Sequence, residues 1–274
     1  MTAGGNGQRE WMREQLQLAA EYFSVAPDGE PVFGWRDRTI GSRVIGHQGA
    51  RWLRVSWADP QWAEGEYWTG NEDAANIVDV PKPTVLDLHE WGAETYRNRA
   101  ELMTLITDRR CSSSPELRSE LQMSSRWWTD LRHALDALGK YPTERGGRTQ
   151  DAVTNRLLAF FGSGIDPTVS GWATAHGDLN WTNITQPDLY LLDWESWGLR
   201  MVGYDAATLY VLSLRAPDAA RNAHDTFSDV LDSPDGIRAQ LYAVARYLKR
   251  VEVGDFTDYA DLLHRHARLL MDRM

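Results

Sequence analysis

The sequence predicts an α+β fold in two parts, with a strand-rich N-terminal third followed by a mainly helical remainder. Residues 32–56 contain short β-prone runs separated by turn-rich stretches, which is typical of antiparallel strands. From about residue 114 onward, the apolar residues recur almost entirely at helical spacing. The exception is a polar stretch, residues 176–184, which precedes the apolar run 189–194. This order of predicted elements, with strands first and helices later, favours a division into two domains, 1–105 and 106–274.

The individual elements follow from local patterns. Residues 9–23 place Trp11, Leu16 and Phe23 at helical spacing, so we expect a helix before the strands. Later helices are expected in roughly the last 60 residues, and at 114–140 and 148–162, where Ser and Pro open the first of these segments. The β-prone runs are 31–35, 42–46, 50–57, 83–91 and 98–106.

The composition argues against several classes of protein. The chain has 274 residues, a single cysteine (Cys111) and a net charge of −10 at pH 7. A nucleic-acid-binding surface needs clustered basic residues, so we expect no nucleic acid partner. One cysteine can form no intrachain disulfide. No stretch approaches the roughly 18 apolar residues of a membrane span, and the first residues lack the apolar core of a signal peptide. We therefore expect a soluble cytoplasmic protein with no membrane partner.

The polar stretch and the apolar run after it carry oxygen ligands in an ordered spacing. Asp178 is followed five residues later by Asn183, and Asp193 follows three apolar residues. Carboxylate and amide oxygens suit Mg²⁺, and phosphoryl transfer needs a carboxylate that accepts or orients the proton of the attacking hydroxyl. An aspartate directly after an apolar strand is costly unless it meets a cation or hydrogen-bond donors. The spacing therefore predicts a site for metal-assisted phosphoryl transfer.

The pattern "HGDLNWTN…LLDWESWG…GYDAATLY" resembles the aminoglycoside phosphotransferase-like and choline-kinase-like small-molecule kinases. This resemblance implies a protein-kinase-like two-lobe fold, ATP or GTP as the nucleotide, and Mg²⁺. It also implies that Asp178 is the catalytic base and that Asn183 and Asp193 bind the metal. By the same resemblance, His176 belongs to the catalytic loop, which it would brace by a hydrogen bond to backbone, and Asp205 buttresses that loop.

In the N-terminal lobe the resemblance is one of topology. Arg54 stands where the family has the lysine that binds the ATP phosphates. Arginine keeps the positive charge and grips phosphate bidentately, but it is not interchangeable with lysine, and a solvated strand residue is the alternative. The helix partner of Arg54 is expected to be Glu72, with Glu66 as the other candidate.

Three further residues are expected on the nucleotide side. Gly41 and Ser42 lie in the region that would face the phosphates, although the glycines there do not spell the protein-kinase glycine loop. Met103 lies in the run that would enter the interlobe hinge, where backbone groups would meet the nucleobase.

The expected function is Mg²⁺-dependent transfer of the terminal phosphate of ATP or GTP to a hydroxyl of a small molecule, such as an aminoglycoside-like compound or an amino alcohol. Acidic residues in the helical part, among them Glu195, Asp218 and Asp225, favour a cationic acceptor. One alternative is a Ser/Thr kinase that acts on a biosynthetic precursor peptide with a partner lyase. The other is a non-catalytic kinase-like binding or regulatory protein, which the arginine at position 54 motivates.

Overall fold

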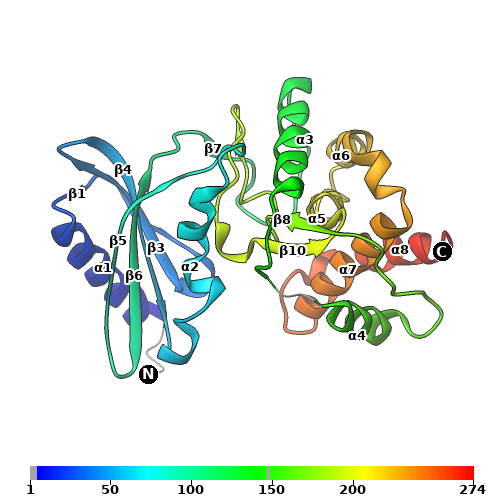
Figure 1. Cartoon of the computed structure of the whole chain (residues 1–274), viewed down its shortest axis with the longest axis horizontal. Coiled ribbons are helices and arrows are strands. Elements are labelled where there is room, and N and C mark those ends of the chain that lie inside the picture. Colours follow the sequence, from blue (N-terminus) through cyan, green and yellow to red (C-terminus); the bar gives the residue numbers. More distant parts are fainter. Residues whose placement is uncertain (1–4, 147–148) are drawn as a thin grey trace. The chain divides into compact units, whose positions relative to one another are not determined.

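The computed structural model describes residues 5–146 and 149–274 and divides the chain into two compact units (Figure 1). Unit 1 comprises the residues up to Asn76 together with Lys82–Thr107. Unit 2 comprises Ile77–Pro81 and Asp108–Met274. The short segment Ile77–Pro81 therefore belongs to the helical unit although it lies within the strand-rich part of the sequence. In unit 2, the carbonyl of Pro81 accepts a hydrogen bond from the amide of Leu191 at 2.8 Å.

Unit 1 is built on an antiparallel sheet with the strand order β1–β3–β4–β6–β5, and β2 also pairs with β3. The register places Gly41 opposite Arg54, and Arg54 opposite Glu101. Because directly opposite residues project to one face, Arg54 and Glu101 lie side by side on the sheet. The strands are β1 (Ala26–Pro27), β2 (Val32–Phe33), β3 (Thr39–Gly46), β4 (Gly49–Ala58), β5 (Val85–Ala93) and β6 (Tyr96–Thr104).

Helix α1 (Gly5–Tyr22) covers the other face of this sheet. Its residues Met12 and Leu16 are buried in one apolar cluster with Leu53 and Val55 of β4. Since side chains alternate along a strand, Arg54 between them points away from α1. The face that carries Arg54 is approached by α2 (Glu66–Asp73), and Figure 1 shows the two helices on opposite sides of the sheet.

Unit 2 is a helical assembly with two short strand pairs. Helix α7 is buried along most of its length and packs against α4, α5, α6 and α8. The strand pairs are β8 (Trp172–Ala175) with β10 (Gly198–Met201), and β7 (Arg109–Arg110) with β9 (Thr185–Gln186). The helices are α3 (Ser125–Lys140), α4 (Gln150–Phe161), α5 (Tyr204–Val211), α6 (Pro217–Leu231), α7 (Pro234–Val251) and α8 (Ala260–Met271).

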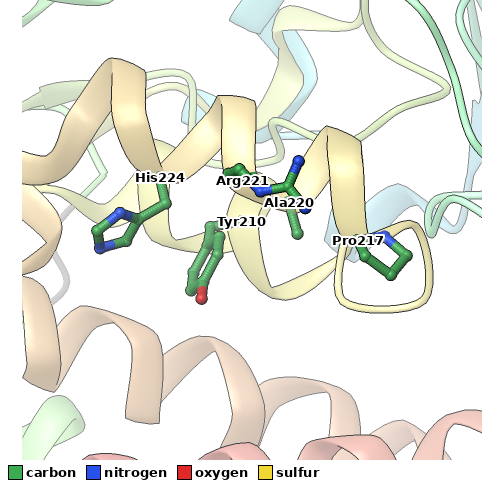
Figure 2. A pocket seen from close by; sticks show the side chains of 5 residues that line it. All are labelled: Tyr210, Pro217, Ala220, Arg221 and His224. Atoms are coloured by element: carbon green, nitrogen blue, oxygen red, sulfur yellow. The ribbon is translucent and has the colours of Figure 1, made fainter.

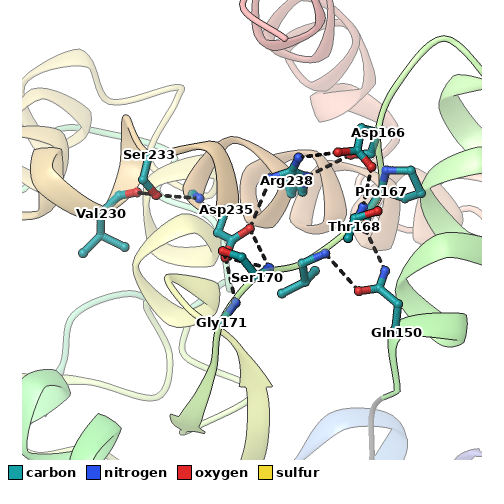
Figure 3. Close-up of polar contacts among 12 residues, drawn as sticks. Gln150, Asp166, Pro167, Thr168, Ser170, Gly171, Val230, Ser233, Asp235 and Arg238 are labelled. Atoms are coloured by element: carbon teal, nitrogen blue, oxygen red, sulfur yellow. Dashed lines mark hydrogen bonds and ion pairs between the residues drawn. The ribbon is translucent and has the colours of Figure 1, made fainter.

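The first turn of α7 fixes the chain that leads into β8 (Figure 3). The carboxylate of Asp235 accepts hydrogen bonds from the amide and hydroxyl of Ser170 and from the amide of Gly171, the last at 3.0 Å. Arg238, one turn later, contacts both Asp235 and Asp166. Because β8 begins at Trp172, this network sets the starting point of the strand that delivers the polar stretch.

The expected α+β two-part fold is confirmed, with one wrong element. The helix predicted over 114–140 begins only at Ser125, where the side chain of Ser124 accepts a hydrogen bond from the amide of Trp127 as an N-cap. Residues 114–124 make tertiary contacts instead, such as the 2.9 Å hydrogen bond from the amide of Leu117 to the carbonyl of Leu212.

The helix predicted over 148–162 is present from Gln150, capped by Thr149, while position 148 lies outside the described residues. The two or three helices expected in roughly the last 60 residues are α6, α7 and α8. Within residues 5–146 and 149–274, no helix has the length and apolar character needed to cross a membrane.

Candidate functional site

Asp178 lies in the loop that follows β8, and its carboxylate is about one-third exposed. The side-chain amide of Asn183 donates to the backbone carbonyl of Asp178 at 3.0 Å and to its Oδ2 at 3.3 Å. The side-chain amide of Asn180 donates to the same carbonyl at 3.0 Å. Two of the residues singled out in the sequence, Asp178 and Asn183, are therefore in direct contact, and the loop presents one carboxylate and one amide together.

Asp205, in the first turn of α5, anchors the start of this loop. Its Oδ2 accepts from the amide of His176 at 2.6 Å, and its Oδ1 accepts from the amide of Gly177 at 3.0 Å. Burial raises the pKa of Asp205, while His176 and these two amides act in the opposite direction. The buttressing role expected for Asp205 thus corresponds to two hydrogen bonds from consecutive backbone amides.

Gly177 permits the turn of the backbone just before Asp178, directly after the amides of His176 and Gly177 that Asp205 holds. Its φ is +80°, in the left-handed region that residues with a Cβ rarely adopt. A Cβ at this position would also lie 2.2 Å from the carbonyl oxygen of Ser196. The loop therefore passes so close to the segment after Asp193 that a side chain at position 177 would not fit.

His176 is fully buried and lies against Trp194, with ring centroids 4.9 Å apart. Its Nε2 lies 2.9 Å from the carbonyl of Leu192. Burial lowers the pKa of His176 against the opposing charges of Asp205 and Asp178, so the neutral ring donates from Nε2. The predicted backbone brace is present, and it joins the loop of Asp178 to the residue before Asp193.

Asp193 follows the short ladder in which Ile184 bridges Leu191 and the amide of Leu192 donates to the carbonyl of Asn183 at 2.8 Å. Asp193 is exposed and has left-handed backbone angles, with φ 65° and ψ 70°. The run before Asp193 forms this single bridge and no regular strand: Leu189 and Leu191 are buried, whereas Tyr190 and Leu192 are half-buried. Asn183 is thus hydrogen-bonded to the residue that immediately precedes Asp193.

Two buried arginines fix the 3₁₀ turn Trp194–Ser196 that follows Asp193. Arg145 donates to the carbonyls of Trp197 at 2.9 Å and Glu195 at 3.0 Å. Arg200 donates to the carbonyl of Ser196 at 2.7 Å. These hydrogen bonds from guanidinium groups to backbone carbonyls hold the backbone of residues 195–197 in place.

The donor set of this loop fits Mg²⁺. Asn183 and Asp193 offer hard amide and carboxylate oxygens, and Mg²⁺ is commonly held by one or two protein ligands with waters and phosphate oxygens completing the shell. Among the described residues, no group of three or more His, Cys, Asp and Glu side chains is arranged to hold a metal ion.

Arg246 of α7 is a member of this site that sequence reasoning missed. Its guanidinium forms an ion pair with Oδ1 of Asp178 and lies 3.2 Å from the hydroxyl of Tyr204. Nothing in the local pattern distinguishes this residue from the other arginines of its helix. A contact across 68 residues of sequence becomes visible only when α7 is folded against the loop.

In unit 1, Arg54 contacts the carboxylate of Glu101 at 3.2 Å and the hydroxyl of Ser56 at 2.7 Å. Glu101 is buried and also accepts from the side-chain amide of Asn71 at 2.8 Å. The carboxylate of Glu72, expected to pair with Arg54, instead contacts Arg99 at 2.6 Å. The reason is geometric, because the strand neighbour Glu101 already stands opposite Arg54 in the sheet.

The other expected nucleotide residues lie inside strands. Gly41 and Ser42 are in β3, and the buried hydroxyl of Ser42 donates to the carbonyl of Arg43 at 2.9 Å. Met103 is in β6, paired with Trp52 and Val85, and its side chain is buried. In this structure, Ser42 therefore presents no hydroxyl to solvent, and Met103 has no exposed side chain.

A pocket of about 350 Å³ lies elsewhere in unit 2, at the end of α5 and along α6 (Figure 2). It contains none of the predicted site residues. Asp218, one of the acids expected to favour a cationic acceptor, pairs with Arg221 of this pocket at 2.8 Å. The lining residues are Tyr210, Pro217, Ala220, Arg221 and His224.

Comparisons with known proteins identify the fold. No protein-family model matches this chain, and no curated protein matches its sequence. Among solved structures, a thermostable mutant of aminoglycoside phosphotransferase APH(4)-Ia, in a ternary complex with ADP and hygromycin B, has a TM-score of 0.63 at 14% identity. That match covers 94% of this chain and 98% of the other chain.

Two further solved structures give the same result. Spectinomycin phosphotransferase APH(9)-Ia, with ADP and spectinomycin, has a TM-score of 0.51 at 9% identity, covering 95% of this chain and 96% of that one. The GDP complex of aminoglycoside 2'-phosphotransferase-IIIa has a TM-score of 0.51 at 11% identity, covering 95% and 98%. This chain therefore has the fold of the aminoglycoside phosphotransferases over nearly its whole length.

Proposed function

We propose that this chain, which has the fold of the aminoglycoside phosphotransferases, is a Mg²⁺-dependent phosphotransferase. It moves the terminal phosphoryl group of ATP or GTP to a hydroxyl of a small molecule. The observation that carries this proposal is the loop in which Asp178 and Asn183 are in contact and in which Asn183 accepts the amide of Leu192, the residue before Asp193. Some solved structures with this fold contain ADP or GDP, and two of these also contain hygromycin B or spectinomycin.

The transfer is a displacement at phosphorus. Asp178 accepts the proton of the acceptor hydroxyl, the acceptor oxygen forms a bond to the γ-phosphorus, and the bond from phosphorus to the β–γ bridging oxygen breaks. The nucleoside diphosphate leaves with the electron pair of that bond. Asn183 and Asp193 would hold Mg²⁺, which supplies charge neutralisation on the phosphate oxygens.

The remaining residues support these groups. Asp205 and His176 hold the loop so that the carboxylate of Asp178 keeps one position, which matters because positioning is a large part of phosphoryl-transfer catalysis. Arg54 in unit 1 is assigned the phosphate contact, as a charged fork in place of a lysine. ATP is abundant in the cytoplasm, and we infer that the reaction takes place there.

The direct test is incubation with ATP or GTP, Mg²⁺ and a panel of hydroxylated metabolites that includes aminoglycosides and amino alcohols. Mass spectrometry would detect a product heavier by one phosphoryl group. We expect Asp178→Asn to lower turnover by about 10²–10⁴-fold, the usual contribution of a general base. A wild-type chain that binds Mg²⁺-nucleotide but phosphorylates no member of the panel would favour the non-catalytic binding protein instead.

A further inference from the structure

The ion pair between Arg246 and Asp178 joins the predicted base to α7, a helix that is buried along most of its length. The two side chains are 26% and 30% exposed, so the pair is at the surface of the site and open to a substrate. Charge-assisted hydrogen bonds of this kind are shorter and roughly twice as strong as neutral ones. A partly buried arginine on a reacting carboxylate is therefore a strong determinant of where that carboxylate lies.

Arg246 is itself held in place. Its Nη1 lies 3.2 Å from the hydroxyl of Tyr204 and 3.5 Å from the carbonyl of Gly177. Its guanidinium carbon lies 5.7 Å from the ring centroid of Tyr247. Both tyrosines are buried, and the residues on either side of Arg246 along α7 are buried as well. The arginine therefore projects from a rigid element toward the loop.

The same helix fixes both ends of the segment that carries the base. Asp235, in the first turn of α7, binds the amides of Ser170 and Gly171 before β8. Arg246, eleven residues later and about 16 Å along the helix, binds Asp178 after β8. Helix α7 thus sets where the segment starts and where its reacting group points.

The two oxygens of Asp178 have unequal partners. Within the described part of the chain, Oδ1 receives the guanidinium of Arg246, whereas Oδ2 has only two long contacts, from the side-chain amides of Asn183 at 3.3 Å and Asn180 at 3.5 Å. A carboxylate oxygen can accept more than one hydrogen bond. The weakly bonded Oδ2 is therefore the oxygen with room for the hydroxyl proton.

We propose that Arg246 is a positioning residue for the transfer reaction: it holds Oδ1 of Asp178 so that Oδ2 faces the acceptor hydroxyl. The proposal rests on the phosphotransferase function proposed above and names a residue for that same site. Arg246 does not touch the transferred group. It acts through the orientation of Asp178, and a misplacement of about 1 Å in such a group lowers the rate by about 100-fold.

The test compares Arg246→Ala and Arg246→Lys with the wild-type chain, using the acceptor that the metabolite panel identifies. We expect Arg246→Ala to lower kcat by about 100-fold while KM for the nucleotide changes less than about 2-fold, because the arginine orients the base and does not bind nucleotide. Arg246→Lys should recover part of the lost kcat, because it restores a cation near Oδ1. Millimolar ethylguanidine should restore turnover of Arg246→Ala.

Arg250→Ala is the matched control. Arg250 lies one turn further along α7, has a similar exposure and pairs with Asp255 instead of the loop. It should keep the wild-type kcat. Thermal unfolding of every variant separates loss of turnover from loss of folding, and Arg246→Lys provides the comparison if Arg246→Ala does not fold.

The inference is overturned if folded Arg246→Ala keeps the wild-type kcat, or if ethylguanidine fails to raise its turnover. It is also overturned if Arg250→Ala loses as much kcat as Arg246→Ala. These outcomes require a wild-type chain that transfers phosphate. A wild-type chain without turnover would instead count against the proposed function itself, so the two failures are distinguishable.

Discussion

The side-chain amide of Asn183 donates to both the backbone carbonyl and the carboxylate of Asp178, at 3.0 and 3.3 Å. The amide nitrogen is thereby turned toward the predicted base, and the amide oxygen, which accepts from the hydroxyl of Thr182 at 3.3 Å, is the proposed metal ligand. One side chain thus couples the position of the base to the position of the metal. A change at Asn183 should therefore disturb both proton transfer and metal binding.

Asp193→Ala should abolish Mg²⁺-dependent turnover and leave the fold intact. The carboxylate is exposed, so its removal opens no core cavity, whereas a lost metal ligand costs several kcal/mol of transition-state stabilisation and at least about 100-fold in kcat. Steady-state kinetics over a Mg²⁺ titration would measure the effect. Asp188→Ala, an exposed acid in the same hairpin, is the control, and equal loss in both variants would contradict the metal assignment.

Arg54→Ala should weaken nucleotide binding by about tenfold or more, since a charge-assisted hydrogen bond contributes about 1.5–3 kcal/mol. Isothermal titration with Mg²⁺ and a non-hydrolysable ATP analogue would measure this affinity. The buried carboxylate of Glu101 keeps Arg99 and Asn71 as partners, so the variant should remain folded.

The control for Arg54 is Arg51→Ala on the same strand. Arg51 donates to the carbonyl of its neighbour Ala50 at 2.8 Å, and it lies three positions before Arg54, so the two side chains point to opposite faces of the sheet. If the two variants bind the ATP analogue with similar affinity, Arg54 contributes to the structure of the sheet and not to nucleotide binding.

Gly177→Ala should destabilise the folded chain by about 2 kcal/mol or more and lower kcat. Alanine at this position would have to keep the left-handed backbone conformation of Gly177. Its Cβ would also clash with the carbonyl oxygen of Ser196. Urea unfolding gives the free energy of unfolding. Gly139→Ala in α3 is the opposite case, because nothing lies within 4 Å of its Cβ and alanine is the better helix former, so that variant should gain about 0.5–1 kcal/mol.

His266 should make stability fall between about pH 6.5 and pH 4. Burial, with a smaller contribution from Arg273, lowers the pKa of His266 from 6.5 to about 4. The unfolded chain therefore binds a proton in this interval that the folded chain does not, and stability rises with pH across it. From pH 7 to pH 5 the loss from this one residue is about 2 kcal/mol.

The measurement is the free energy of unfolding of the wild-type chain and of His266→Gln at pH 7 and pH 5. The variant is expected to be less stable at pH 7, because the ring contacts Gln240 at 3.1 Å and packs on Tyr210. The informative quantity is the difference between the two pH values, which should shrink in the variant. An unchanged difference would assign the acid sensitivity to other groups.

The parts of this site that could be predicted from the sequence are those whose residues lie close together along the chain. Asp178 and Asn183 lie in one loop, and their contact follows from a spacing of five residues. Asp205 is more distant, but the resemblance placed it in the buttressing role that the hydrogen bonds to His176 and Gly177 now describe. The strands followed from short β-prone runs between turn-rich stretches, and the first helix followed from apolar residues at helical spacing.

The parts that sequence reasoning missed depend on tertiary contacts. Arg246 meets Asp178 only because α7 packs beneath the loop, and Glu101 meets Arg54 only through strand register. Residues 114–124 have helical spacing, but hydrogen bonds such as that of Leu117 to Leu212 hold them as an irregular connection with several bends. In each case a partner distant in sequence decided the outcome.

The segment Ile77–Pro81 limits how this protein can be divided. Its residues Ile77 and Val80 are buried in the helical unit, and Pro81 accepts the amide of Leu191, two residues before Asp193. A fragment expressed from Asp108 onward would lose these apolar contacts and leave that amide without its acceptor. Unit 2 is therefore not an independent unit that can be expressed from Asp108 alone. Circular permutation or supplying the segment as a separate peptide would be needed to isolate it.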